Sequence, residues 1–263
     1  MFGIILLGDL MKIEGVKKTK SGKYKITFDN KETISTYDDV ILNNGLLFKK
    51  EVDNELLDKL NIETSYYDIY NKTIKFISRK LRSEKEVKIF LDKNNATNSD
   101  KKKIVTKLKD IKLINDSFFA NAYCQDKMNL SNDGPCKIKK ELISNDIEKN
   151  IIDEAMSKID ENMVYEKLTK LIIKKINSNH NKSNYMLKQK IVGDMINLGY
   201  SKEMIVEIID SNLKSNKSVI ENEYKKIYRK LEKKYEGEEL ERQVRIKLMQ
   251  RGFSGEDINN IDI

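Results

Sequence analysis

Apolar residues recur in this chain with steps of four, five and five positions, and the spacing returns at a fixed interval. Three clear copies begin at Ile138, Ile191 and Val244, so equivalent anchors lie 53 residues apart. Val87 and Leu91 open an earlier copy, in which residues 97–101 form an insertion. Such self-similarity is typical of repeat proteins, in which each unit buries its apolar face against its neighbours. The full anchor sets are Ile138, Leu142, Ile147 and Ile152; Ile191, Met195, Tyr200 and Ile205; and Val244, Leu248, Phe253 and Ile258.

Each copy predicts two helices joined by a short turn. A step of four keeps apolar side chains on one helix face, whereas a step of five spans a turn. A further amphipathic helix precedes each pair, so the unit is a three-helix module. The sequence therefore predicts a mainly α protein in which tandem three-helix repeats form an elongated, curved array. The predicted repeats are residues 66–114, 115–160, 161–213 and 214–263.

Residues 1–65 follow a different pattern and are assigned to an N-terminal region with β structure. Short β-prone runs occupy 13–16, 24–28 and 33–35, and the second alternates apolar and polar side chains. This alternation predicts a strand with one buried face, within a small antiparallel meander or hairpin. Two short helices should follow, one capped by Asp38 and one spanning 53–60. Residues 61–65 are expected to form a connector to the first repeat.

The chain begins with an apolar stretch, residues 2–10, that is far shorter than the ~20 residues needed to cross a bilayer. It also lacks the basic residues and cleavage site of a signal peptide. The stretch is either a first strand or a set of residues added by an upstream start codon. Met11 resembles a natural start, so the second interpretation is favoured and residues 1–10 would then lie outside the native protein. We expect no membrane contact. Two cysteines, Cys124 and Cys136, without a CxxC pattern predict reduced thiols in a cytoplasmic protein.

Charge is the property of the composition that bears most on function. The chain has 50 Lys and Arg residues against 42 Asp and Glu, which gives a net charge of +8 and a pI of about 9.1. A basic protein favours polyanions or acidic protein surfaces as partners. Frequent Lys, Asn and Ile are also expected from an A+T-rich genome, and this alternative weakens the inference.

The sequence contains no recognisable set of catalytic residues. Its single histidine, His180, lies in an Asn/Ser-rich loop without Cys, Asp or Glu at ligand spacing. Phosphate-binding glycine loops and the common hydrolase motifs do not occur. Carboxylates alternate with lysines, as on solvated helix faces. We therefore expect no enzyme, no cofactor and no metal site.

Basic residues gather beside the apolar anchors of several repeats. Lysines on helix surfaces usually serve solubility, but their recurrence at comparable positions makes a role in binding an equal alternative. Such binding would be electrostatic and would weaken with salt. Because serial repeats present equivalent faces, we predict a basic row along one side of the array. Its candidate residues are Arg79, Lys80, Arg82, Lys137, Lys139, Lys140, Lys188, Lys190, Lys225, Lys226, Arg229, Lys230 and Arg245.

Three short motifs resemble those of the RecX family, which regulates the RecA recombinase. Residues 82–87 (RSEKEV) resemble RSExEL, 115–120 (NDSFFA) resemble DDxxFA, and 134–142 (GPCKIKKEL) resemble GPxxIxxEL. Their order and spacing match the family, with Asn115 and Val87 as mild departures. The β-containing start and the fourth repeat resemble the longer form of low-G+C Gram-positive bacteria. The resemblance implies mostly fold-defining roles for Arg82, Ser83, Glu84, Asp116, Phe119, Ala120, Gly134, Pro135, Ile138 and Leu142.

This resemblance implies a monomeric, non-enzymatic protein that binds the RecA filament on single-stranded DNA. Bound in the helical groove of the filament, it would block or destabilise the active form and lower ATP hydrolysis and strand exchange in DNA repair. Contact with single-stranded DNA would be weak or made through the filament. The alternative is a helical protein that binds nucleic acid directly and acts without RecA. The two differ in whether the protein slows the RecA ATPase at concentrations where it scarcely binds naked DNA.

Overall fold

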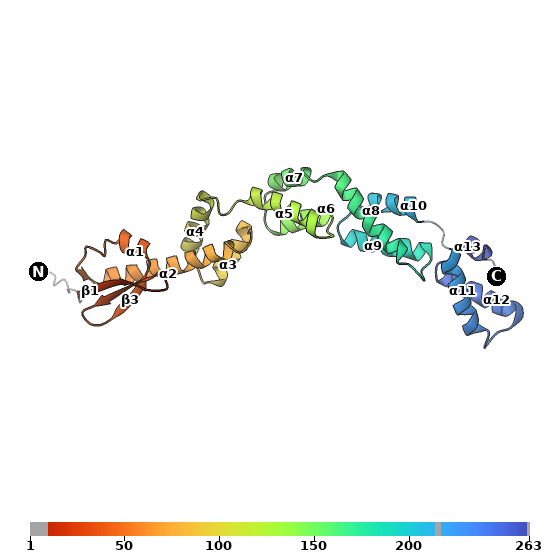
Figure 1. Ribbon diagram of the computed structural model, residues 1–263, viewed down its shortest axis with the longest axis horizontal. Helices are drawn as coiled ribbons and strands as arrows, with labels where there is room; N and C mark the ends of the chain where they lie inside the picture. Colours follow the sequence, from red (N-terminus) through yellow and green to blue (C-terminus); the bar gives the residue numbers. More distant parts are fainter. Residues whose placement is uncertain (1–9, 214–216, 262–263) are drawn as a thin grey trace, which may run out of the picture. The chain divides into compact units, whose positions relative to one another are not determined.

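The computed structural model describes residues 10–213 and 217–261. It divides into two compact units, with the division between Asn115 and Asp116. The chain is mostly helical (65%), with a small antiparallel sheet near its N-terminus (Figure 1). The predicted class, three-helix repeats after a small β region, is confirmed. The expectation about a native start at Met11 concerns residues that, apart from Leu10, lie outside the described part.

The N-terminal sheet has four antiparallel strands in the order β3-β2-β1-β4. The predicted meander is confirmed for its first three strands. The fourth, two residues long, was not predicted and pairs with the start of β1. The strands are β1 (Met11–Lys18), β2 (Tyr24–Phe28), β3 (Thr33–Thr36) and β4 (Glu51–Val52).

One face of the sheet supplies a small core with the helices that follow it. Ile26 and Phe28 of β2 are fully buried, together with Val40 of α1 (Asp38–Asn43). The predicted cap of α1 is wrong: Tyr37 holds the N-cap position, no side chain bonds there, and Asp38 lies in the first turn. A carboxylate in that turn still favours the helix dipole.

The expected connector at 61–65 is also wrong, because helix α2 runs without a break from Asn54 to Ile77. The predicted boundary after residue 65 therefore falls inside a helix. The polar run is explained by its contacts: Glu63 accepts a hydrogen bond from Asn44 Nδ2 (2.7 Å), and Thr64 Oγ1 bonds Thr36 Oγ1 (2.6 Å). The first half of α2 packs on the sheet and the second half on the first repeat.

Repeat 1 combines the second half of α2 with α3 (Glu84–Lys93) and α4 (Asn98–Asp110). Ser83 and Glu86, three residues apart, have the sequence pattern of a capping box, and the structure shows both of its reciprocal hydrogen bonds. Val87 and Leu91 are fully buried. The predicted insertion lies at the start of α4, which has 13 residues against nine in the corresponding α7.

The second unit contains three further three-helix repeats. Their first helices follow the predicted amphipathic pattern, and their second and third helices carry the anchors. Repeat 2 is α5 (Asp116–Leu130), α6 (Pro135–Ser144) and α7 (Lys149–Ser157); repeat 3 is α8 (Glu161–Asn177), α9 (Asn184–Asn197) and α10 (Lys202–Asn212); repeat 4 is α11 (Lys217–Leu231), α12 (Gly237–Gln250) and α13 (Gly255–Asn259).

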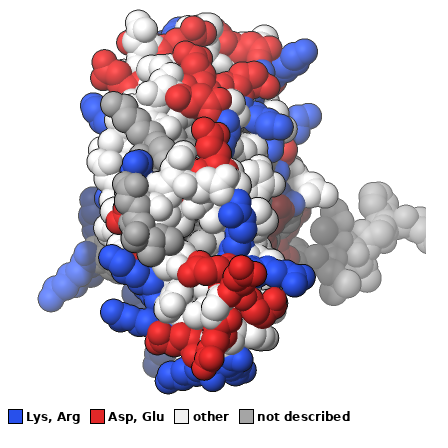
Figure 2. Space-filling view, turned by 90° about the vertical axis from the view of Figure 1, so that its right-hand side faces the viewer, with Lys and Arg blue, Asp and Glu red and all other residues white. Residues whose placement is uncertain are grey.

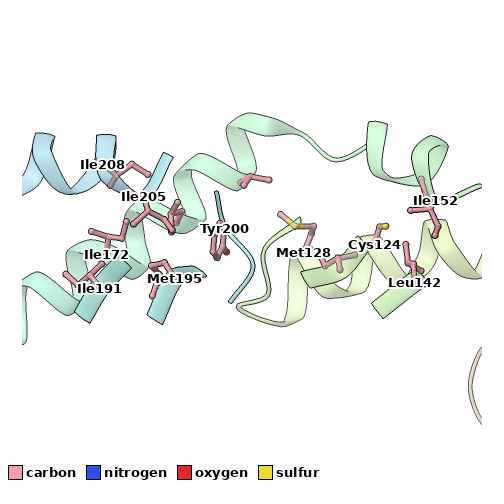
Figure 3. Close-up of a cluster of buried hydrophobic side chains, with 14 of the residues drawn as sticks. Cys124, Met128, Leu142, Ile152, Ile172, Ile191, Met195, Tyr200, Ile205 and Ile208 are labelled. Carbon is pink, nitrogen blue, oxygen red and sulfur yellow. The ribbon is translucent and has the colours of Figure 1, made fainter. Parts of the chain in front are cut away.

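The repeating anchors form the cores of these repeats, as predicted. All twelve anchors of the three clear copies are buried except Ile258, which is half-buried. Repeats 2 and 3 share one apolar cluster. Tyr200 lies in it between the group around Cys124 and Leu142 and the group around Ile191 (Figure 3). Repeat 4 has a cluster of its own.

Repeats 2 and 3 are joined where the N-terminus of α6 meets the C-terminus of α9. Gly134 N–H donates to Leu198 O (2.6 Å), and Cys136 N–H donates to Gly199 O (3.0 Å). Gly199 has φ +90°, and a Cβ there would lie 2.4 Å from Lys137 N. A Cβ on Gly134 would lie 2.6 Å from Gly199 O. Both glycines are therefore required for this close approach.

Repeats 3 and 4 are joined in the same way. Ser183 Oγ, at the N-cap of α9, donates to Arg251 O (2.9 Å) at the end of α12. Gly252 has φ +79°, and a Cβ there would lie 2.9 Å from Ser183 Oγ. The sequence predicts glycine caps followed by an aromatic that packs back across the turn. Positive φ confirms the caps, and the structure adds their role as contact points between repeats.

Candidate interaction surface

In the first unit, the structure separates the predicted basic residues by their contacts. The guanidinium of Arg82 stacks on Phe76, 3.9 Å from the ring centroid, and bonds Glu86 (3.1 Å). Its side chain is only 15% exposed. Lys80 also pairs with Glu86 (3.4 Å). Arg82 thus stabilises the α2–α3 junction, whereas Arg79 is exposed and has no ion pair within the described residues.

The predicted cluster on α6 is largely neutralised by carboxylates. Lys137 pairs with the buried Asp133 (2.7 Å) and Lys139 with Asp153 (2.8 Å). The hydrogen bond from Lys137 lowers the pKa of Asp133 to about 2, with further help from Lys127. Among the described residues Lys140 has no ion-pair partner. Of the three lysines, it alone offers an uncompensated charge.

The candidate basic residues on α9 and α12 also differ in whether a carboxylate compensates their charge. Lys188 pairs with Asp210, whereas Lys190 is exposed and has no ion pair in the described part of the chain. Arg245 bonds the side chain of Asn259, and because that amide is neutral the charge of the guanidinium is kept.

Helix α11 carries the densest group of uncompensated basic residues in the second unit. Lys225, Arg229 and Lys230 are exposed, and none has an ion pair among residues 217–261. Residues four apart are separated by roughly 6 Å along a helix. Lys226 instead pairs with Glu223 (2.9 Å), which is buried and also bonded by Arg251. We name Lys225, Arg229 and Lys230 the α11 basic face.

Both signs of charge occur on the surface of the protein. On the face that Figure 2 displays, acidic and basic side chains are both present. Exposed pairs contribute little binding because each charge is already compensated. Uncompensated groups such as the α11 basic face are therefore the stronger candidates for contact with a polyanion.

Comparison with known proteins places these repeats in a family. The model of the second three-helix domain of RecX matches residues 115–156. The chain is 28% identical to the regulatory protein RecX of Listeria innocua, with 95% of each chain covered. For the corresponding protein of Streptococcus uberis the identity is 26%, covering 95% of this chain and 98% of that one.

Solved structures add a further match. A crystal structure of RecX from Lactobacillus salivarius is 30% identical, with a TM-score of 0.51, and the match covers 56% of this chain and 96% of that one. The chain belongs to the RecX family. A second crystal structure of a RecX protein has the same fold, with a TM-score of 0.66 at 22% identity, and covers 76% of this chain and 99% of that one.

The residues of the RecX motifs make contacts within the helices and their cores. Ser83 caps α3, and Glu84 pairs with Lys88 (2.7 Å) and with Lys109. Phe119 and Ala120 are buried on α5, whose first residue is Asp116. Pro135 occupies the first turn of α6, as its fixed φ favours. Gly134 forms the joint described above, and the anchors Ile138 and Leu142 are fully buried.

The single histidine and the two cysteines differ in their exposure. Within the described residues, no group of three or more His, Cys, Asp or Glu side chains could hold a metal ion. His180 is exposed in the α8–α9 connector. Both cysteines are free, Cys124 buried and Cys136 exposed. None of the described helices is both long and apolar enough for a membrane span.

Sequence reasoning missed the interactions that decide which basic residues are available. The partners of Lys139 and Lys188 lie 14 and 22 residues away in the sequence. Local sequence patterns cannot identify ion-pair partners that are so far apart along the chain. The stack of Arg82 on Phe76 is closer in sequence, and an aromatic six residues before an arginine across a turn was the available signal.

Proposed function

We propose that this RecX family member binds the RecA filament on single-stranded DNA and lowers its ATPase and strand-exchange activity. It acts without catalysis of its own, as a monomer in the cytoplasm. Membership of the family is the observation that carries the proposal, since relatives that match over 95% of the chain are named regulatory protein RecX.

The distribution of charge supports a partner that contains nucleic acid. Of the predicted basic residues, those that are exposed and have no carboxylate partner within the described residues are Arg79, Lys140, Lys190, Arg245 and the α11 basic face. Ammonium and guanidinium groups that neutralise phosphates release counterions, so their contribution falls as salt rises. A filament with DNA at its centre offers both a protein groove and phosphates.

Direct binding of nucleic acid without RecA is the second candidate. It would draw on the same uncompensated basic residues. The two candidates differ in the affinity of the protein for DNA without RecA. A protein that acts by binding DNA directly must bind naked DNA at the concentrations at which it acts.

The experiment that separates the candidates titrates the protein into RecA on single-stranded DNA while ATP hydrolysis is followed. Binding of the protein to the same DNA without RecA is measured in parallel over a salt series. We expect the ATPase to fall at protein concentrations that leave naked DNA unbound. An ATPase that falls only together with saturation of naked DNA would instead support the direct binder.

The triple change Lys225→Glu, Arg229→Glu and Lys230→Glu tests the α11 basic face in this assay. We expect weaker inhibition and a shallower salt dependence, because three phosphate contacts are removed. The matched control reverses three exposed lysines of the sheet unit, Lys12, Lys20 and Lys25. If the control weakens inhibition as much, net charge rather than the α11 face is responsible.

A further inference from the structure

A pocket of about 210 Å³ lies at the turn between α8 and α9 of repeat 3. Its floor is apolar, formed by Leu187 and Ile191 of α9. Its polar lining comes from the end of α8, the connector and the exposed side of α9. The polar and charged residues that matter are Lys175, Lys182, Lys190, Asn179, Asn181 and Asp194.

The connector that forms one wall is held by its own hydrogen bonds. Asn179 Nδ2 donates to Lys182 O (2.8 Å), and Lys182 N–H donates to Asn179 Oδ1 (3.0 Å). The carbonyl groups at the end of α8 are engaged as well, since Ser178 N–H donates to Lys174 O and Asn179 N–H to Ile176 O. The connector is therefore held in place before any ligand binds, which makes the pocket preorganised. The carbonyl groups of Lys174, Ile176 and Lys182 already accept hydrogen bonds from the protein.

The charge inside the pocket is positive. Its single carboxylate, Asp194, already accepts a hydrogen bond from Lys175 Nζ (2.6 Å). Lys182 and Lys190 have no ion pair within the described residues, and the amide of Asn181 adds donor capacity. Two uncompensated ammonium groups thus face a concave site whose acid is neutralised.

The corresponding place in repeat 2 shows why the lysines of repeat 3 are left uncompensated. Glu141 and Asp194 are equivalent, since each precedes the second anchor of its repeat. In repeat 2 a second acid, Asp133, joins Glu141, and Lys127 bonds both at 2.9 Å. Repeat 3 has no acid in the role of Asp133: Asp133 precedes the N-cap of α6, and the residue that precedes Ser183, the N-cap of α9, is Lys182. The positive charge is therefore specific to repeat 3 among these two.

We propose that this pocket binds a phosphate group. Inorganic phosphate and phosphomonoesters carry more charge than a carboxylate, and they and a phosphodiester have several acceptor oxygens, which suits lysine and amide donors converging from two sides. The volume admits the group together with bridging waters, since one water requires only roughly 10–15 Å³ of such space. If the phosphate is a phosphodiester of single-stranded DNA, the pocket would give repeat 3 a defined contact with the DNA of the filament. This DNA-binding version of the inference rests on the proposed function.

The test is an NMR titration of the full-length protein, followed through backbone amide shifts. One arm adds inorganic phosphate against chloride at matched ionic strength, and the other adds an oligothymidylate. We expect saturable shifts at residues 178–191. The double change Lys182→Gln with Lys190→Gln should weaken phosphate binding roughly tenfold, which is the loss expected when two charged contacts near the surface are removed.

Lys170→Gln with Lys174→Gln is the matched control, because both lysines are exposed on α8 and lie outside the pocket lining. It should leave binding within about twofold. Saturation by phosphate and by the oligonucleotide at the same residues supports a nucleic-acid phosphate, and saturation by phosphate alone supports a free phosphate compound. If neither arm gives a saturable shift, or if the control variant loses as much phosphate affinity as the double variant, the proposal that this pocket binds phosphate is wrong.

The RecA assay keeps this inference separate from the proposed function. If the wild-type protein saturates with phosphate and fails to slow the RecA ATPase, the proposed function fails and the pocket stands. If the protein slows the ATPase and no arm of the titration saturates, the pocket fails and the proposed function stands.

Discussion

The change Gly199→Ala tests the joint between repeats 2 and 3. Two effects act at this position. A non-glycine residue in left-handed backbone costs about 1–2 kcal/mol, and Gly199 has φ +90°. The added Cβ would also lie 2.4 Å from Lys137 N and 2.5 Å from its Cβ, which are too close to be tolerated without movement.

The movement should open the two hydrogen bonds of the joint. Gly134 N–H to Leu198 O and Cys136 N–H to Gly199 O would each lose about 0.5–1.5 kcal/mol. Alanine restricts the unfolded chain and returns roughly 0.4–1 kcal/mol. We therefore expect Gly199→Ala to lower the free energy of unfolding by about 2–4 kcal/mol.

Two other glycines separate these effects. Gly237 has φ +57° with nothing within 4 Å of an added Cβ, so Gly237→Ala should cost only the backbone strain, about 0–1.5 kcal/mol after the unfolded-state gain. Gly193 lies within α9, also with open space, and Gly193→Ala should stabilise by about 0.5–1 kcal/mol.

Urea unfolding followed by circular dichroism measures all three variants. Native-state hydrogen exchange adds a local readout, since the amides of Gly134 and Cys136 should lose protection in Gly199→Ala alone. Equal costs for Gly199→Ala and Gly237→Ala, with those two amides still protected, would refute the close joint.

Three further predictions follow from buried groups. Leu142→Asp, Met195→Asp and Leu248→Asp each place a charge in a fully buried anchor site and should cost several kcal/mol; thermal melts that overlay the parent would contradict the repeat assignment. Tyr200→Phe removes a buried hydroxyl without a hydrogen-bond partner in the described structure, so stability should hold or rise by up to about 1 kcal/mol, and a clear loss in urea unfolding would reveal a partner. The pKa of Asp133 is lowered to about 2 from an ordinary 3.8, so its ion pairs stabilise the fold above pH ~4 and are lost as the pH falls towards 2. Asp133→Asn should therefore flatten the dependence of the free energy of unfolding on pH between these values. An unchanged slope in urea unfolding would count against these ion pairs.

Much of the helical fold was predictable because the repeats are defined by local spacing. Ile138 and Leu142 share a helix face whatever surrounds them, and Ser83 with Glu86 caps a helix through contacts three residues apart. The continuity of α2 was not predictable in this way. Thr64 and Glu63 are polar because the sheet bonds them, and a run of polar residues looks like a loop when that sheet is not seen.

The candidate surface was less predictable than the fold. The availability of a lysine depends on whether a carboxylate lies within ~4 Å, and helix packing decides this. Lys139 and Lys140 are neighbours with the same flanking pattern, yet Asp153 compensates only the first. The pocket of repeat 3 was missed for a related reason, because Lys175, Lys182 and Lys190 are brought together by a turn that loop composition alone does not define.

The joints also restrict how this array can change length during evolution. Each joint depends on which way the N-terminus of a second helix points, and every added residue turns a helix by about 100°. Helix α9 has 14 residues and α6 has 10. A difference of four residues is about one full turn, so the longer helix still directs its first residue towards the next repeat. Insertions of one or two residues would rotate that end away, so natural variation in these helices should occur in whole turns, and variation in the array in whole repeats.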